Sequence, residues 1–441
     1  MKKFISLILF SMSAFLFAQQ TITLSQALSQ ARENNLHLQN YYYQKETAYW
    51  NYQNSKAMFM PKLNLVYNGV YRQDEIKRSI ANFDFVLQDK QNHITRLQLD
   101  HVLFAGGKVY NAHRFQKIQN ETSVNLYQRI SFETDMLVSN TYYSILQNRE
   151  NLDVLQSHLV LCQAIKEDLS ETVETDILQW DLRIIEIEKQ IVATQNAQKT
   201  LIQQWGVVLG IPIIQDIPLP EDTSVDHFML EIREFALLDN ATKTAKMNEY
   251  IETVLENNLY LRNIALFQDA SKYRKNIDKA DFMPTVYMSA FYELTNDTNI
   301  KDIKFLQEPA WQVGFNISIP IFHGFRNFTN YKASQNQLQA QGRNLIENRR
   351  DQIEQAKQAW FDFDLSASTI MQNEKYYNLA ERSLDITKNL HDKNVFTNVA
   401  LIDAQNDALQ SHLNFINSIY DYISAKIKME NFKHLRPLHN Q

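Results

Sequence analysis

The side chains that most often carry out catalysis or bind metals occur in this chain, but they form no recognised pattern. The eleven histidines are scattered, with no His-Glu-x-x-His sequence and no cysteine–histidine cluster, so we assign no metal. The Gly107-Lys108 pair lacks the upstream glycine and the following hydroxyl residue of a phosphate-binding loop. Asp362 and Asp364 fall on different faces of a helix, which does not suit joint acid–base work. We therefore expect neither an enzyme nor a bound cofactor.

The most specific pattern in the chain is an internal repeat. The segment Glu-Asn-Asn-Leu-x-Leu occurs at residues 33–38 and again at 256–261. The segment Lys-Ala-x-Phe-Met-Pro occurs at 56–61 and again at 279–284, with the same offset of 223 residues. Two separate blocks that match at one offset indicate a duplication, in which one structural unit is used twice.

The N-terminal residues are typical of an exported protein. Lys2 and Lys3 precede an apolar run from Phe4 to Phe17, which predicts a signal peptide over residues 1–18. The alternative is a membrane anchor, but this run is shorter than the ~20 residues that a spanning helix needs. Removal of the two lysines changes the formal charge from −6 to −8, so the mature chain has no basic surface suited to nucleic acid.

The rest of the chain offers neither a disulfide framework nor a transmembrane helix. Cys162 is the only cysteine, and we interpret it as a small apolar residue on a helix. No stretch after residue 20 approaches 18 uncharged apolar residues. If this protein spans a membrane, it must do so with strands.

Two long segments, 108–205 and 343–436, contain neither glycine nor proline. Such a composition, rich in good helix formers, predicts long helices over 107–170 and 176–209 and over 325–391 and 398–433. A seven-residue spacing of apolar residues supports this for the last helix, because it keeps one seam facing a neighbouring helix. The residues in that seam are Ile402, Ala408, Leu409, Phe415, Ile416, Tyr422, Ile423 and Met429.

Pro61 and Pro284 end their helices and open stretches in which apolar and polar residues alternate. We expect strands at about 61–72, 92–104, 284–295 and 308–321, with a charged loop from Arg72 to Gln91. Each strand is long enough to cross a bilayer when tilted. The alternative is a small soluble sheet whose apolar face packs on the helices. In lipid, the backbone N–H and C=O groups at the two edges of a four-stranded sheet would have no hydrogen-bond partners. Two, three or four chains would therefore have to close one barrel.

The predicted elements follow the order helix, strand pair, long helical hairpin, and this order occurs twice. It resembles the order found in the TolC family of outer-membrane efflux proteins. The likeness rests on the repeated segments, on the junctions at Pro61 and Pro284, and on the exits Phe104-x-Gly106 and Phe322-x-Gly324. Two further stretches support it, Trp205-Gly206-Val207-Val208-Leu209-Gly210 and Ala400-Leu401-Ile402-Asp403-Ala404-Gln405.

The resemblance implies a mainly α fold with a small β part. Tandem-duplicated helical hairpins would form an α-barrel, and four strands per chain would contribute to a trimeric 12-stranded outer-membrane β-barrel. It places the first repeat at 19–210, an equatorial linker at 211–248, the second repeat at 249–433 and a C-terminal tail at 434–441.

The resemblance also implies a function. The chain would be a trimeric channel-tunnel in the outer membrane, with its helices in the periplasm. It would serve as the passive exit duct of a tripartite efflux pump or type I secretion system. Its partners would be a periplasmic adaptor (membrane fusion) protein and an inner-membrane RND or ABC transporter. The alternative from another class is a soluble periplasmic coiled-coil scaffold or adhesin.

Family members close the periplasmic end with rings of aspartates, and Asp403 matches one such position, whereas Ala400 stands in place of the second. Three Asp403 carboxylates would favour cations at a constriction. The other interpretation is that Asp403 lies favourably in the first turn of its helix. Asp176 matches the corresponding point of the first repeat, where the first-turn interpretation is the stronger one.

The resemblance also points to residues at the helix tips that would contact an adaptor. The candidates are Ser170 and Glu171 in the first repeat and Asn394 and Phe396 in the second. They depart from the family pattern, because the usual Val-Gly pair is absent and Phe396 stands where a basic residue is common.

Overall fold

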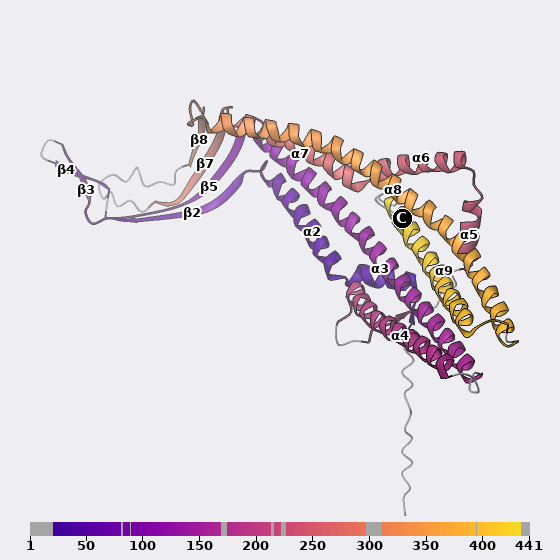
Figure 1. The fold of residues 1–441 in the computed structure, drawn as a ribbon. Helices are drawn as coiled ribbons and strands as arrows, with labels where there is room; N and C mark the ends of the chain where they lie inside the picture. Colours follow the sequence, from indigo (N-terminus) through magenta and orange to yellow (C-terminus); the bar gives the residue numbers. More distant parts are fainter. Residues whose placement is uncertain are drawn as a thin grey trace, which may run out of the picture. The chain divides into compact units, whose positions relative to one another are not determined.

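A computed structural model of the chain describes residues 21–80, 83–88, 90–168, 174–212, 216–221, 226–296, 311–393 and 395–433 (Figure 1). The expected signal peptide (1–18) and C-terminal tail (434–441) lie outside these residues. The chain forms two compact units. Unit 1 comprises Met1–Gln39, Ser131–Val254 and Gln355–His434, and unit 2 comprises Asn40–Ile130, Leu255–Glu354 and Leu435–Gln441.

The described residues are mainly helical, as predicted, with a smaller β part. The helices are α1 (Leu24–Asn34), α2 (Leu36–Ala57), α3 (Lys108–Asp168), α4 (Glu174–Leu209), α5 (Asp226–Ala236), α6 (Asn240–Asn257), α7 (Leu259–Ala280), α8 (Arg326–His391) and α9 (Asn398–Lys433). The strands are β1 (Thr21–Ile22), β2 (Lys62–Tyr71), β3 (Ile76–Ile80), β4 (Phe83–Gln88), β5 (Gln91–Ala105), β6 (Leu219–Pro220), β7 (Thr285–Asn296) and β8 (Trp311–Ser318).

The repeated Glu-Asn-Asn-Leu segment is a helix start in both halves. The Asn35 side chain accepts a hydrogen bond from the Leu38 amide at 3.1 Å, and Asn258 accepts one from Leu261 at 3.0 Å. A side-chain oxygen in this position pairs with a backbone donor that has no partner within the helix. Helices α2 and α7 therefore begin at equivalent residues, and both end at the alanine of the second repeated segment.

The four long helices α3, α4, α8 and α9 begin and end within two residues of the predicted positions. The expected seam of α9 is buried or half-buried along its whole length, and Cys162 of α3 is buried with no disulfide partner. Helix α4 begins at Glu174, two residues before the expected start, and so places Glu174 and Asp176 in its first turn. No helix in the described part of the chain is long and apolar enough to cross a membrane.

Strands β2, β5, β7 and β8 form one antiparallel sheet in that order and lie side by side in Figure 1. Strand β8 ends at Ser318, ahead of the predicted 321, because Pro320 has no N–H to donate to a neighbouring strand. The prediction of a loop from Arg72 to Gln91 is wrong. Strands β3 and β4 pair there as a hairpin, since the backbone satisfies its hydrogen bonds locally. A further short pair joins β1 to β6.

The apolar side chains of the four-stranded sheet lie on its surface. Leu65 is 67% exposed, Trp311 75% and Phe315 66%. The described residues therefore leave this face of the sheet uncovered, and it is not an ordinary buried core.

The turns that follow the two strand pairs share a left-handed backbone conformation. Gly106 and Gly107 have φ of 59° and 82°, and Gly324 has φ of 59°. A Cβ atom on Gly106 would lie 2.4 Å from Cβ of Met283, so this turn needs glycine for space as well as for conformation. In the second exit Phe325 has φ of 60°, the only non-glycine residue with positive φ among the described residues.

Candidate functional site

The first turn of α9 meets the first two turns of α4 inside unit 1 through a buried polar contact. Trp180 of α4 is fully buried, and its Nε1 donates to Oδ1 of Asn398 at 2.6 Å. The Asn398 amide in turn donates to Gln179 Oε1 at 3.2 Å and to the carbonyl of Asp176 at 3.4 Å. A buried N–H without a partner is costly, so this contact fixes where along its length α4 faces α9.

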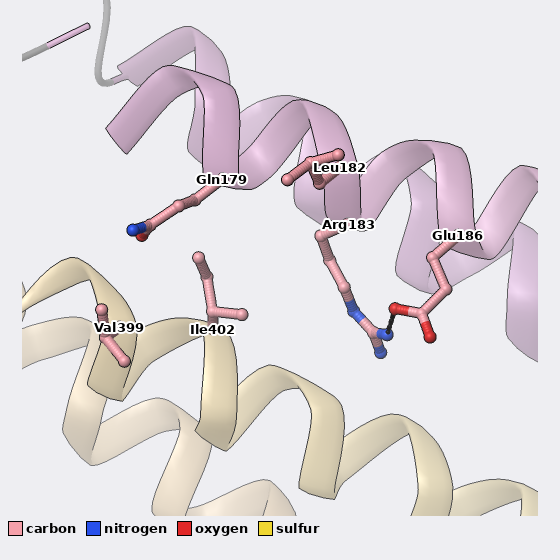
Figure 2. Close-up of a pocket in the computed structure, with 6 residues that line it drawn as sticks. All are labelled: Gln179, Leu182, Arg183, Glu186, Val399 and Ile402. Carbon is pink, nitrogen blue, oxygen red and sulfur yellow. Dashed lines mark hydrogen bonds and ion pairs between the residues drawn. The ribbon is translucent and has the colours of Figure 1, made fainter. Parts of the chain in front are cut away.

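A second polar contact lies further along the two helices, about one turn on in α4 and about two turns on in α9. The guanidinium of Arg183 is buried and donates from Nε to Oε1 of Gln405 at 2.8 Å and from Nη1 to Oε2 of Glu186 at 2.7 Å. Figure 2 shows Arg183 and Glu186 among the residues around a pocket between α4 and α9. The volume of this pocket is about 310 Å³. The pocket is lined by Gln179, Leu182, Arg183, Glu186, Val399 and Ile402.

The two aspartates predicted from the resemblance lie near these helix starts. Asp403 is an exposed residue in the second turn of α9, because that helix begins at Asn398. The alternative interpretation, that Asp403 lies in the first turn, is therefore wrong. Asp176 is half-buried in the first turn of α4, where a carboxylate interacts favourably with the helix dipole. Ala400 is half-buried and brings no second carboxylate.

The candidate adaptor-contact residues fall mostly outside the described part of the chain. Ser170, Glu171 and Asn394 belong to the residues whose structure is not described. Phe396, between α8 and α9, is 44% exposed, and its neighbour Val395 is also exposed. The described part of the α8–α9 connection therefore presents apolar side chains to solvent.

Sequence reasoning missed one group of side chains. His158 of α3, Glu381 of α8 and His412 of α9 each place a potential ligand atom within 4.8 Å of the other two. Burial lowers the pKa of His158 to about 4, assisted by the charges of His412 and Arg183. Burial also lowers the pKa of His412 and raises that of Glu381. These residues come from three helices far apart in sequence, so no motif spacing could reveal them.

Comparison with known proteins shows which of them are similar to this chain in sequence or in fold. Residues 250–431 match the family model described as outer membrane efflux protein. A search of curated proteins found no match. Among solved structures, the outer membrane protein VceC from Vibrio cholerae is similar at a TM-score of 0.74 and 14% identity, covering 93% of this chain and 96% of that one.

The CmeC outer membrane channel of Campylobacter jejuni is similar at a TM-score of 0.74 and 13% identity, with 95% of this chain and 87% of that chain covered. At these identities the structural likeness establishes the fold. The family match, which lies in the second half of the chain, adds the sequence relationship. Residues 250–431 thus resemble the outer membrane efflux protein family in sequence, and the chain shares the fold of the outer membrane proteins to which it is similar.

Proposed function

We propose that three copies of this chain assemble into a passive channel-tunnel in the outer membrane. Each copy contributes its four-stranded sheet to a 12-stranded barrel, and the long helices continue the tube into the periplasm. The chain serves as the exit duct of a tripartite efflux pump or type I secretion system, and its partners supply the energy.

The four-stranded sheet is the observation that carries this proposal. Its order leaves the outer edges of β2 and β8 without another strand among the described residues. Its apolar side chains, such as Leu65 and Phe315, are exposed. An open sheet cannot sit in lipid with unpaired edges, and an exposed apolar sheet face is a liability in water. Pairing of β2 from one copy with β8 from the next resolves both difficulties.

The number of copies follows from the strands and the family. Two copies would close eight strands, and side chains fill a barrel of that size. Three copies close twelve strands, as the family resemblance implies, which leaves a lumen. Residues 19–210 and 249–433 then supply two similar segments of the wall per copy. The linker 211–248 between them contains β6, α5 and the first part of α6.

We propose that the α4 and α9 starts form the periplasmic constriction. Three copies of the exposed Asp403 would make a carboxylate ring there, with Asp176 of α4 as a secondary candidate. Closely spaced carboxylates attract cations and repel anions. The neighbouring tips, Ser170, Glu171, Asn394 and Phe396, would contact a periplasmic adaptor. That adaptor would couple the channel to an inner-membrane RND or ABC transporter.

Crosslinking between edge strands tests the assembly. In a background with Cys162→Ala, cysteine replaces Leu65 on β2 together with one of a series of β8 residues, Trp311, Val313, Phe315 or Ile317. A bifunctional thiol reagent should then join neighbouring copies and give a ladder that ends at three chains on a denaturing gel.

The matched control pairs Leu65→Cys with Leu97→Cys, since these residues lie opposite each other on β2 and β5 of one chain. That pair should crosslink within the chain and give no ladder. A monomer that stays in solution without detergent, and shows no ladder at any β8 position, would instead favour the soluble scaffold.

A further inference from the structure

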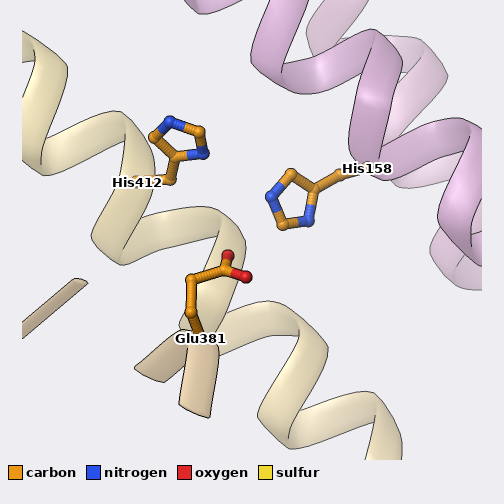
Figure 3. A group of neighbouring side chains, drawn as sticks. All are labelled: His158, Glu381 and His412. Carbon is orange, nitrogen blue, oxygen red and sulfur yellow. The ribbon is translucent and has the colours of Figure 1, made fainter. Parts of the chain in front are cut away.

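The group formed by His158, Glu381 and His412 is not needed for a passive duct, yet its chemistry is specific. Each residue offers one ligand atom, and the three atoms lie within 4.8 Å of one another. Figure 3 shows the two imidazoles and the carboxylate turned toward a shared space. Two imidazole nitrogens and one carboxylate oxygen are a common ligand set for zinc. We propose that these three residues bind a divalent transition-metal ion of the zinc class, joining α3 to α8 and α9.

Supporting contacts hold the two imidazoles in place. Nδ1 of His158 lies 3.3 Å from Nε2 of Gln405, so this contact holds one side of the ring while the other ring nitrogen faces away from the amide. The His412 ring stacks on Tyr377 with ring centroids 4.4 Å apart. Both contacts restrict the orientation of the rings.

The local charges also suit a cation. Asp385 lies one helical turn beyond Glu381, and its charge acts on that carboxyl. The positive Arg183 is paired with Glu186 at 2.7 Å.

Gln405 gives the site a distinctive property. Its Oε1 accepts from Arg183 Nε at 2.8 Å, which turns its amide NH₂ toward Nδ1 of His158. An ion on the opposite ring nitrogen of His158 requires a proton on Nδ1, and that proton needs an acceptor. The amide must then turn its oxygen to His158 and give up Arg183. A carboxylate at position 405 would accept from both partners at once.

The test uses the mature full-length protein in detergent, stripped of metal with a chelator and titrated with Zn²⁺ or Co²⁺. We expect about one ion per chain, a higher melting temperature with Zn²⁺, and visible absorption bands with Co²⁺. His158→Ala, His412→Ala and Glu381→Gln should each weaken binding by more than the ~100-fold that loss of a supporting partner can cause. His37→Ala, an exposed histidine on α2, should bind as the wild type does.

Gln405→Glu separates a metal site from a merely structural cluster. The new carboxylate should raise the Zn²⁺ affinity by roughly 10-fold, because it orients the His158 imidazole without giving up Arg183. Unchanged or weaker binding by this variant would overturn the assignment. Binding that persists in all three ligand variants, or a wild type that takes up no ion, would do the same. None of these results depends on whether the chain forms a channel.

Discussion

Replacement of Asn398 by alanine tests the contact that joins α4 to α9. The Trp180 side chain is 0% exposed and Asn398 6%, so the variant leaves a buried indole N–H without its acceptor. An orphaned buried donor costs about 2 kcal/mol. The loss should appear as easier local opening of the first turns of α9 and of the facing turn of α4.

Hydrogen exchange measures this opening directly, peptide by peptide. A loss of about 2 kcal/mol corresponds to roughly 30-fold faster exchange in peptides from the starts of α4 and α9. Peptides from β2 and β5 should exchange at the wild-type rate. Asn414→Ala, at an exposed position on the same helix, is the matched control and should change little.

A double-mutant cycle with Trp180→Phe checks the cause. Phenylalanine removes the N–H, so Asn398→Ala should add much less exchange in the Trp180→Phe background than in the wild type. If the two changes simply add, the hydrogen bond does not explain the effect and the reasoning is refuted.

Three further predictions concern the constriction, the strand exits and a helix start. Asp403→Ala should raise the resting conductance of the proposed channel in planar bilayers, or weaken its block by multivalent cations; unchanged single-channel behaviour would remove Asp403 from the proposed gate. Gly106→Ala should lower thermal stability far more than Gly324→Ala. A Cβ on Gly106 would clash with Met283, whereas nothing lies within 4 Å of a Cβ built on Gly324, so the Gly324 variant has only a backbone cost of about 1–2 kcal/mol. A side-chain hydrogen bond from Thr242 lowers the pKa of Asp239, which precedes α6. Asp239 therefore stabilises the folded state when the pH is above the ordinary pKa of an aspartate. This stabilisation is lost as the pH falls through the lowered pKa of Asp239. Asp239→Ala should speed hydrogen exchange at the start of α6 at neutral pH and remove this acid dependence.

The helices and most of the strands were predictable from sequence because their signals are local. The absence of glycine and proline identified the long helices, and the repeated segments indicated a duplicated unit. The structure adds that Asn35 and Asn258 of these segments make equivalent hydrogen bonds at the starts of α2 and α7. Alternation of apolar residues located the main strands. The β3–β4 hairpin was missed, since a charged segment can still pair with itself through its backbone.

What the local signals could not supply is the alignment of helices that are distant in sequence. That alignment brings Trp180 to Asn398, places Arg183 against Gln405, and gathers His158, Glu381 and His412 from three helices. Periodicity specifies which side of a helix is apolar, but any shift by a whole turn preserves that pattern. Only the packed tertiary structure selects one alignment, because buried polar groups must find their partners there.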